Sequence, residues 1–317
     1  MRTPIRLAAL GLAVAAAAVV VPTAFADDAA DLNVMSWNIC GEAGGKRGDA
    51  GYCAYRDDPQ AKVDQIAELV EERDLDVVML QEVCAEAEDS HLERLRAKLG
   101  DGWQFGNARG ARPEPDEEGN PRTDCRGELN GELGVAIAIK ASDADFTSKN
   151  TLPADPTGES KQTLPTLCAT TSDWPTTVCT THILPDPADP RREQQIDNVR
   201  DYVWDARDNL VLGGDFNMFP GSDELEPITG AFDECDRRSY TDGDKKDEIT
   251  HHAWTGGEHV YRKRDHIFAT QAGDGSNFTA CDSDTDRMDT TENESDSGAP
   301  NGYSDHAPLT GTVTLGA

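Results

Sequence analysis

Short apolar runs that end in an acid, an amide or a histidine recur along the whole chain. Residues 77–80 run Val-Val-Met-Leu before Gln81 and Glu82, and Leu210-Val211-Leu212 opens into Gly213-Gly214-Asp215. A continuous apolar run of this length is typical of a strand that is buried on both faces. Such strands, when helices separate them along the chain, fold with sheets inside and helices outside. Strand ends that face one side of a sheet meet in space, so we expect their polar residues to share one cleft.

The residues at these strand ends carry oxygen and imidazole donors. Singly, an Asp or Asn after a strand is more often a turn residue than a ligand, so the interpretation rests on the full set. Carboxylate and amide oxygens without thiolates suit a hard cation such as Mg²⁺, with Mn²⁺ or Ca²⁺ as alternatives. Histidines beside that cation can carry protons, which favours hydrolysis of phosphate esters. The set comprises Asn38, Glu82, His182, Asp215, Asn217, Asp265, Asp305 and His306.

Helix-start signals precede three amphipathic stretches, which begin near residues 59, 90 and 190. Residues 281–300 consist almost entirely of Asp, Glu, Ser, Thr and Asn, a composition typical of a solvated loop. The chain has no internal repeat at a fixed period and no linker between two cores. We therefore expect one domain of mixed α/β structure.

The first 26 residues have the pattern of a secretory signal peptide. Arg2 and Arg6 precede an apolar run over residues 7–21, and residues 24–26 read Ala-Phe-Ala, a site of the type that signal peptidase cuts. No later run is long and apolar enough for a membrane span. We expect a secreted, extracellular protein without stable membrane insertion, whose mature chain is residues 27–317. Nothing in the sequence indicates an oligomer, so we expect a monomer.

All eight cysteines follow the predicted cleavage site. An even number in an exported chain indicates disulfide bonds, although the sequence leaves most pairings open. Cys168 and Cys179 are equidistant from the turn-like residues 172–175, so we predict that they face each other across a hairpin. A zinc site is disfavoured because the chain has no Cys-x-x-Cys spacing.

The chain is strongly acidic. Sixty Asp and Glu stand against 29 Lys and Arg in 317 residues, which gives a formal net charge of −31. This excludes a generally basic nucleic-acid coat protein. A polyanionic substrate has to be bound locally, by a metal ion or by a few well-placed cations.

The polar strand ends form an ordered set of motifs that resembles the endonuclease/exonuclease/phosphatase superfamily, the deoxyribonuclease I-like proteins. The resemblance extends from residue 32 to about residue 314. It implies a four-layer α/β (α+β) sandwich, in which two mixed β-sheets are flanked by helices and the active site lies at one edge. The motifs are Trp37-Asn38, Leu80-Gln81-Glu82, Thr181-His182, Gly214-Asp215-Phe216-Asn217, Asp265-His266-Ile267 and Ser304-Asp305-His306.

The resemblance implies Glu82 as the main metal ligand, with Asn38 and Asp305 beside the ion directly or through water. One departure is Cys40, which stands where some nucleases of the family carry a carboxylate. This difference weakens the case for a second metal-binding acid on the first strand.

The catalytic roles are implied in the same way. His306, oriented by Asp265, is expected to act as general base or to polarise the phosphate. Asp215 and Asn217 are expected to position the attacking water or the phosphate. His182 is expected to hydrogen-bond the scissile phosphate or to protonate the leaving oxygen.

The substrate class remains open at this point, and a nuclease is our preferred hypothesis. A nuclease needs cations that bind flanking phosphates, and basic residues gather at residues 191–192 and 262–264. The alternatives are a sphingomyelinase-like phospholipase C that binds a phospholipid head group, with Trp174 as its one candidate for membrane contact, a phosphatase of small substrates, and a catalytically inactive binding module. Arg126 is either a phosphate ligand or a solvated loop arginine, and the family match at Asn130 is loose. The candidate substrate-binding residues are Arg126, Asn130, Arg191 and Arg264.

Overall fold

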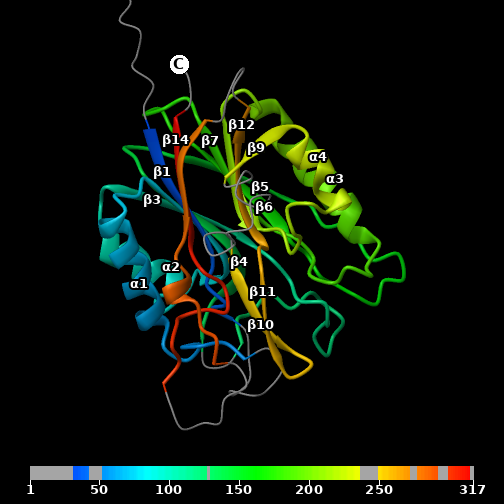
Figure 1. Cartoon of the computed structure of the whole chain (residues 1–317). Coiled ribbons are helices and arrows are strands. Elements are labelled where there is room, and N and C mark those ends of the chain that lie inside the picture. Colours follow the sequence, from blue (N-terminus) through cyan, green and yellow to red (C-terminus); the bar gives the residue numbers. More distant parts are fainter. Residues whose placement is uncertain are drawn as a thin grey trace, which may run out of the picture.

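Two mixed six-stranded sheets form the centre of the molecule (Figure 1). The computed structural model describes residues 31–42, 52–126, 129–235, 249–271, 277–291 and 299–314, and the expected signal peptide lies outside these ranges. The first sheet has the order β13-β14-β1-β2-β4-β3. Its strands are β1 (Asp31–Asn38), β2 (Val77–Ala85), β3 (Trp103–Arg109), β4 (Glu132–Lys140), β13 (Phe278–Ser283) and β14 (Leu309–Thr314).

The second sheet has the order β5-β6-β7-β8-β12-β9. In each sheet one pair of strands is parallel, β1 with β2 and β7 with β8, and the other neighbours are antiparallel. A separate hairpin consists of β10 (His251–Thr255) and β11 (Glu258–Arg262). The strands of the second sheet are β5 (Asp145–Asn150), β6 (Pro165–Thr170), β7 (Thr177–His182), β8 (Leu210–Asp215), β9 (Phe232–Glu234) and β12 (Asp265–Thr270).

Helices cover the outer face of each sheet (Figure 1). α1 (Pro59–Glu72) and α2 (His91–Leu99) pack on the first sheet through a core that includes Trp37 and Ile66. α3 (Arg191–Val203) and α4 (Glu226–Thr229) pack on the second sheet. Three short 3₁₀ helices complete the described elements, at Trp204–Ala206, Asp223–Leu225 and Thr285–Arg287.

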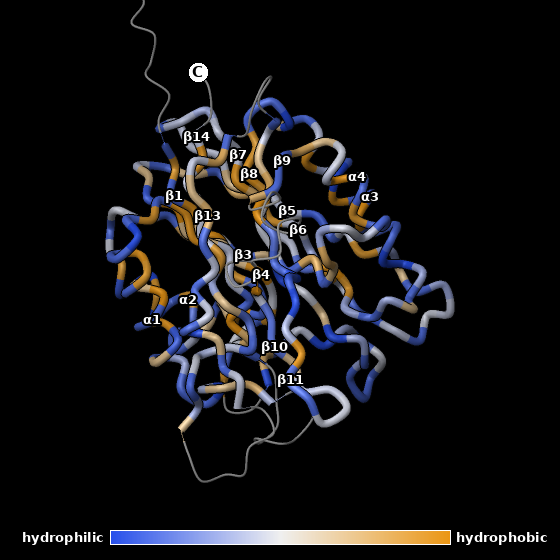
Figure 2. Tube along the Cα trace, in the orientation of Figure 1, coloured by the Kyte–Doolittle hydropathy of each residue, from blue (hydrophilic) through white to orange (hydrophobic). Residues whose placement is uncertain are grey.

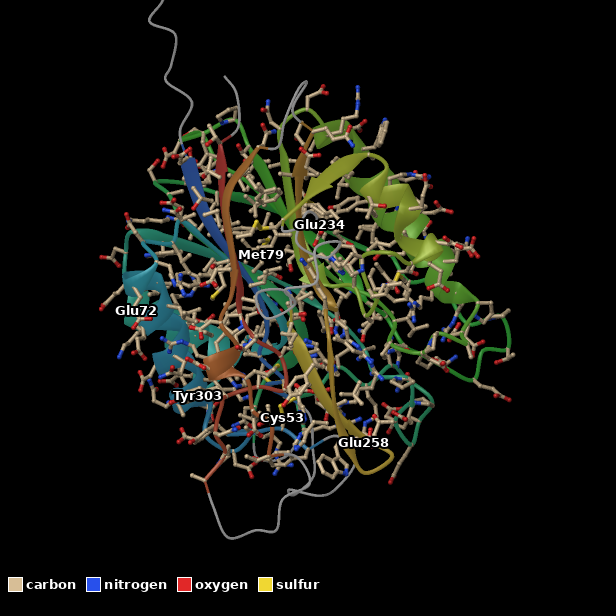
Figure 3. All side chains as sticks on the ribbon, in the orientation of Figure 1. Cys53, Glu72, Met79, Glu234, Glu258 and Tyr303 are labelled. Carbon is tan, nitrogen blue, oxygen red and sulfur yellow. A yellow bond between two sulfur atoms is a disulfide. The ribbon has the colours of Figure 1, made fainter. Side chains whose placement is uncertain are left out.

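A third core lies between the two sheets, and its members include Val34, Met79, Val211 and Ile267. Figure 2 shows the hydrophobic residues concentrated along the central strands, with hydrophilic residues over the outer loops. In Figure 3, Met79 lies in the middle of the molecule while Glu72 lies on the outer side of α1. The order helix, sheet, sheet, helix confirms the four-layer sandwich predicted from the sequence.

Local sequence signals determine where the helices begin. The Asp58 side chain accepts a hydrogen bond from the backbone N–H of Ala61 and caps α1, and the Ser90 hydroxyl accepts one from Glu93 N–H at the start of α2. Such side chains satisfy N–H groups that have no partner inside the helix. α3 begins at Arg191, directly after Pro190. The three predicted helix starts are confirmed to within a residue or two.

Two sequence expectations are wrong. Residues 281–300 are not one continuous loop, because β13 extends to Ser283 and a 3₁₀ helix follows. Trp174 does not project as a membrane-contacting side chain, because it is partly buried and packs against the core between the sheets. An apolar ring at a hairpin tip loses contact with water by folding back onto the core.

Four disulfides join the cysteines. Cys168 and Cys179 are directly opposed on β6 and β7 and are bonded, which confirms the predicted pair. The other bonds are Cys40–Cys53, Cys84–Cys125 and Cys235–Cys281. None of the helices in the described ranges is long and apolar enough to cross a membrane.

Glycine is required at position 214, one residue before Asp215. A Cβ atom at Gly214 would lie 2.3 Å from the carbonyl oxygen of Thr181 on the neighbouring strand β7. Real Cβ atoms do not approach a backbone oxygen this closely, so a side chain here would push β8 away from β7.

We therefore expect Gly214→Ala to lower the free energy of unfolding by about 1–3 kcal/mol, the usual range for overpacking. Urea denaturation measures the change. Gly102→Ala is the matched control, since a Cβ atom there would meet nothing within 4 Å. Equal stability of the two variants would show that β8 and β7 are not tightly packed at this point.

Candidate active site

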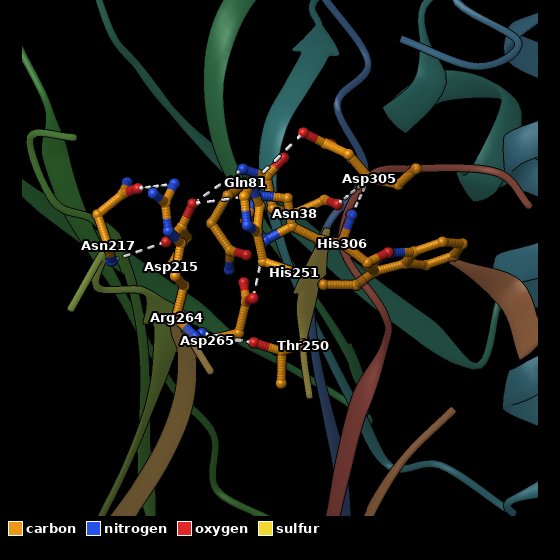
Figure 4. A network of polar contacts seen from close by, with 12 residues as sticks. Asn38, Gln81, Asp215, Asn217, Thr250, His251, Arg264, Asp265, Asp305 and His306 are labelled. Atoms are coloured by element: carbon orange, nitrogen blue, oxygen red, sulfur yellow. Dashed lines mark hydrogen bonds and ion pairs between the residues drawn. The ribbon is translucent and has the colours of Figure 1, made fainter. Parts of the chain in front are cut away.

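The polar strand ends of both sheets meet at one edge of the sandwich (Figure 4). In the first sheet, Asn38 is paired with Gln81 at the ends of the parallel strands β1 and β2. In the second sheet, His182 is paired with Asp215 at the ends of β7 and β8, and Asp265 opposes Asp215 at the start of β12. Parallel neighbours deliver their last residues to the same side, which brings these side chains together.

The segment that carries Asp305 and His306 precedes β14, which runs antiparallel to β1. It therefore passes the end of β1 at Asn38. The Ser304 hydroxyl donates to the Asn38 carbonyl at 2.7 Å, and the Trp37 indole N–H donates to the His306 carbonyl at 2.9 Å. These buried bonds fix the segment against the first sheet.

The Asp215 carboxylate lies at the centre of the site. Its Oδ2 accepts a hydrogen bond from the Asn38 amide at 3.1 Å, and its Oδ1 accepts one from the Asn217 backbone N–H at 2.8 Å. The Nε2 atoms of His182 and His306 lie 3.5 Å and 3.6 Å from Oδ2. Burial acts to raise the pKa of Asp215, but the positive charges of His306 and His182 outweigh it and lower the pKa. Asp215 is therefore a carboxylate at neutral pH.

His306 is fixed on its other side by Asp265. Its Nδ1 lies 2.8 Å from the Asp265 carboxylate, and both side chains are buried. Burial alone would lower the pKa of His306, but the nearby charges of Asp265 and Asp215 raise it to about 10. The imidazole is therefore protonated at neutral pH, with Nδ1–H directed at Asp265 and Nε2–H available to the site.

Asn217 forms the link to the cationic side of the site. Its amide nitrogen lies 3.3 Å from His182 Nε2 and donates to the Ile183 carbonyl at 2.9 Å. Its amide oxygen accepts a hydrogen bond from the Arg264 guanidinium at 3.0 Å. Backbone, imidazole and guanidinium together hold this side chain in one orientation.

Glu82 and Asn217 both have left-handed backbone conformations, with φ of 52° and 54°. Glu82 lies at an irregularity in the pairing of β2 with β4, between Leu80 and Val83. A non-glycine residue in this conformation costs about 1–3 kcal/mol, and such strain is concentrated at functional sites. The strain turns the Glu82 side chain out of the sheet ladder toward Asn38, whose amide donates to Glu82 Oε1 at 3.1 Å.

Cavities lie on both sides of this network. One of about 410 Å³ is lined by residues that include Pro185, Asn217 and Arg264. The other, of about 250 Å³, is lined by residues that include Pro185, Glu82 and His182. Pro185 lines both cavities, so they adjoin and form a continuous depression past the catalytic side chains.

Comparison with known proteins agrees with this geometry. A sequence model described as the Endonuclease/Exonuclease/phosphatase family matches residues 35–306. The chain belongs to this family. No curated protein matches the sequence.

The solved structures show the same fold. An endonuclease/exonuclease/phosphatase family protein from Bacteroides thetaiotaomicron is 18% identical, with a TM-score of 0.59 over 91% of this chain and 99% of that one. A mannosyl-6-phosphatase from the same organism is 17% identical, with a TM-score of 0.56 over 89% and 99%. TDP2 of D. rerio, in complex with a single-strand DNA product, is 18% identical, with a TM-score of 0.51 over 89% and 98%.

The chain is thus a phosphoester hydrolase of the endonuclease/exonuclease/phosphatase family, whose members generally depend on a divalent metal. The residues present fit such an ion. Glu82 and Asp305 supply carboxylate oxygens, the donors that hard cations prefer. Desolvation and the charge of Glu82 raise the pKa of Asp305 to about 6, a surplus of negative charge that a bound cation would offset.

Asn38 is oriented differently from the expectation for a direct ligand. Its amide oxygen accepts a hydrogen bond from the Cys40 backbone N–H at 2.9 Å, and its amide nitrogen faces Glu82 and Asp215. In this orientation Asn38 positions the two carboxylates. Contact with an ion through water stays compatible with the geometry.

The predicted substrate-binding residues divide into two pairs. Arg264 and Arg126 line the two cavities. Asn130 is exposed and donates to Asp89 at 2.9 Å, and it lines neither cavity. The Arg191 guanidinium is taken up by Asp189, with contacts of 2.6–3.1 Å, because the side chain folds back on the turn before α3. The placement of Asn130 and Arg191 at the substrate is therefore wrong.

Two buried residues at the site escaped the sequence analysis. His251 lies 3.9 Å from Asp305 through Nε2, and its ring packs edge-on against His306. It follows no apolar run, so no sequence signal marked it. Lys62 donates to the carbonyls of Ile39 and Tyr303 at 2.7 Å and 2.6 Å and so joins the segments that carry Asn38 and Asp305. Its spacing from Ile66 on the apolar face of α1 was a signal that could have revealed it.

The elevated pKa of His306 can be tested with Asp265→Asn. Removal of the carboxylate charge should lower the His306 pKa from about 10, because burial then acts with less opposition. Nitrogen-15 NMR titration of the imidazole measures this shift. We expect turnover to fall by on the order of a hundredfold, the usual contribution of a placed acid or base.

Asp101→Asn is the control, because it removes the same charge from an exposed position. The protonated His306 contributes stability in full below the pKa of an unfolded histidine, about 6.5. That contribution should disappear as the pH rises toward 10. An unchanged His306 pKa in Asp265→Asn would refute the assigned pairing.

Proposed function

We propose that this protein is a secreted phosphodiesterase that depends on a divalent metal and acts as a nuclease on extracellular DNA or RNA. The observation that carries the proposal is the presence of a cavity on each side of the Asp215 and His306 network. A phosphomonoester has a substituent on one side of the phosphorus only. A diester has groups on both sides, and these two cavities accommodate them.

The charges of the site assign separate steps to its residues. Asp215, held as a carboxylate, accepts a proton from the attacking water. His306, held as an imidazolium, donates a hydrogen bond from Nε2 to a non-bridging phosphate oxygen. His182, on the cavity side shared with Glu82, protonates the leaving oxygen, and Asn217 holds the phosphate between them.

Glu82 and Asp305 are the residues that would hold the metal, with Asn38 alongside. When bound, Mg²⁺, or Mn²⁺ or Ca²⁺ in its place, offsets charge on the phosphate oxygens. Arg264 reinforces this by positioning Asn217 at 3.0 Å. All other groups of the proposed mechanism belong to the chain itself.

A nucleic-acid substrate is favoured over a phospholipid. The one aromatic residue considered for membrane contact, Trp174, packs against the core. Basic residues line the cavities instead, with Arg126 in one and Arg262 and Arg264 in the other. The signal-peptide pattern and the four disulfides support secretion, and we propose that the enzyme acts as a monomer.

The proposal is tested by incubating the purified protein with plasmid DNA, RNA, sphingomyelin vesicles and 4-nitrophenyl phosphate. Each substrate is combined with Mg²⁺, Mn²⁺, Ca²⁺ or EDTA. We expect cleavage of a nucleic acid with a divalent cation and none with EDTA, since the phosphate charge is then not offset. Hydrolysis of the monoester or of the vesicles alone would overturn the nuclease assignment.

The metal role of Glu82 is tested with Glu82→Gln, which keeps the shape of the side chain and removes its charge. We expect turnover to fall by on the order of a hundredfold or more, and Mg²⁺ binding measured by calorimetry to weaken. Glu86→Gln serves as control, because Glu86 lies just beyond the same strand and is exposed. Unchanged Mg²⁺ affinity in Glu82→Gln would contradict this role.

A further inference from the structure

Unpaired arginines are rare in this acidic chain. Most arginines of the described residues have a carboxylate oxygen within 4.0 Å. Within the described ranges the exceptions are Arg94, which donates to two neutral oxygens, and the pair Arg262 and Arg264. These two guanidiniums line the same cavity, beside Asn217. Two cations without an acidic partner, next to a phosphate-processing site, are complementary to a further anionic group.

Arg192 adds a third guanidinium to this cavity. Its side chain is buried and binds Glu224 through one terminal nitrogen at 2.9 Å, but its Nε has no hydrogen-bond partner. A buried N–H group without a partner is costly, and a bound ligand atom would satisfy it. The side chain therefore points to a ligand in this cavity.

Two exposed aromatic side chains border the same space. Phe219 is 54% exposed and Tyr261 is 46% exposed, and both line the cavity together with Pro187 and Met218. The volume, about 410 Å³, lies in the range of small-molecule sites. Flat apolar walls combined with guanidiniums match a nucleotide, which has an aromatic base and a phosphate.

We propose that this cavity binds the nucleotide next to the scissile phosphate, with an unpaired base against Tyr261 and Phe219 and the adjoining phosphate on Arg262 and Arg264. The inference rests on the proposed nuclease function and specifies its substrate class as single-stranded nucleic acid. A base in a duplex is stacked and paired, and it has to leave the helix to reach these walls. A base in a single strand reaches them without that cost.

The test uses the double variant Tyr261→Ala/Arg262→Ala, since both residues are exposed and lie outside the catalytic network. Trp204→Ala/Arg207→Ala is the matched control. It removes an exposed tryptophan and its stacked arginine from the 3₁₀ helix after α3. Melting temperatures of both variants confirm that they fold.

Two substrates separate binding in the cavity from the reaction itself. For a short oligothymidylate, we expect the double variant to raise KM by about tenfold with kcat nearly unchanged, because stacking contributes to binding. For methyl 4-nitrophenyl phosphate, a small diester without a base, kcat/KM should stay at the parent value. The parent should also cleave the single strand faster than a duplex of matched length, and the double variant should lose most of that preference.

Binding measured without turnover separates the inference from the proposed function. A fluorescein-labelled oligothymidylate is titrated in Mg²⁺ against His306→Ala, with and without the two further substitutions. If the single strand binds in a manner that depends on Tyr261 and Arg262 but the parent does not cleave it, the cavity assignment stands and the nuclease function fails. If the parent cleaves it and the double variant behaves like the control, the cavity assignment fails and the function stands. If sphingomyelin vesicles bind and the oligonucleotide does not, both fail.

Discussion

The buried carboxylate of Asp215 is the interaction on which the site depends. It accepts hydrogen bonds from Asn38 of the first sheet and from the backbone of Asn217 beyond the second, so it joins the two halves of the sandwich at their common edge. A buried charge is tolerated only when it is paired and hydrogen-bonded. His182 and His306 supply the opposing charge, and Asp265 in turn holds His306. Each member is therefore stable only in the presence of the others.

The same network explains how an acidic protein can bind an anionic substrate. The formal net charge of −31 repels a polyanion at long range, and salt screens that repulsion at distances beyond about 10 Å. Within the site the balance differs, because His306 is protonated and Arg264 points at Asn217. Affinity thus depends on a few cations at short range, where screening is weak. Divalent cations and moderate salt should help such a substrate to approach.

The sequence predicted most of the fold and most members of the site because both rest on local patterns. An apolar run followed by a polar residue fixes a strand and its end, which located Glu82 and Asp215. Family resemblance then supplied the order of the sheets. The failures have a common cause, which is that they depend on tertiary contacts. Arg191 and Arg192 are neighbours in the chain, but only Arg192 reaches the cavity, since the turn before α3 binds the other.

Residues that act through burial alone were also beyond the sequence. His251 is brought to Asp305 by a backbone contact between the start of β10 and the segment before β14, with His252 N–H donating to the Asp305 carbonyl at 2.9 Å. Nothing within either segment predicts that pairing. Trp174 illustrates the reverse case, because a hairpin tip is exposed by default and becomes buried only when a core lies within reach.

Two disulfides begin directly beyond the residues that hold the site together. Cys40 follows Asn38 by two positions, and Cys84 follows Glu82 by two positions. Each bond ties the chain just after a strand end to a distant loop, and this restrains the strained turn at Glu82, whose φ is 52°. The sulfurs of Cys40 and Cys53 also lie near Asp305, with ligand atoms within 4.8 Å of one another. Reduced, they would offer soft thiolate ligands beside a site built from oxygen donors. In the disulfide they cannot act as thiolates, so the oxidised state both braces the site and preserves its preference for a hard cation.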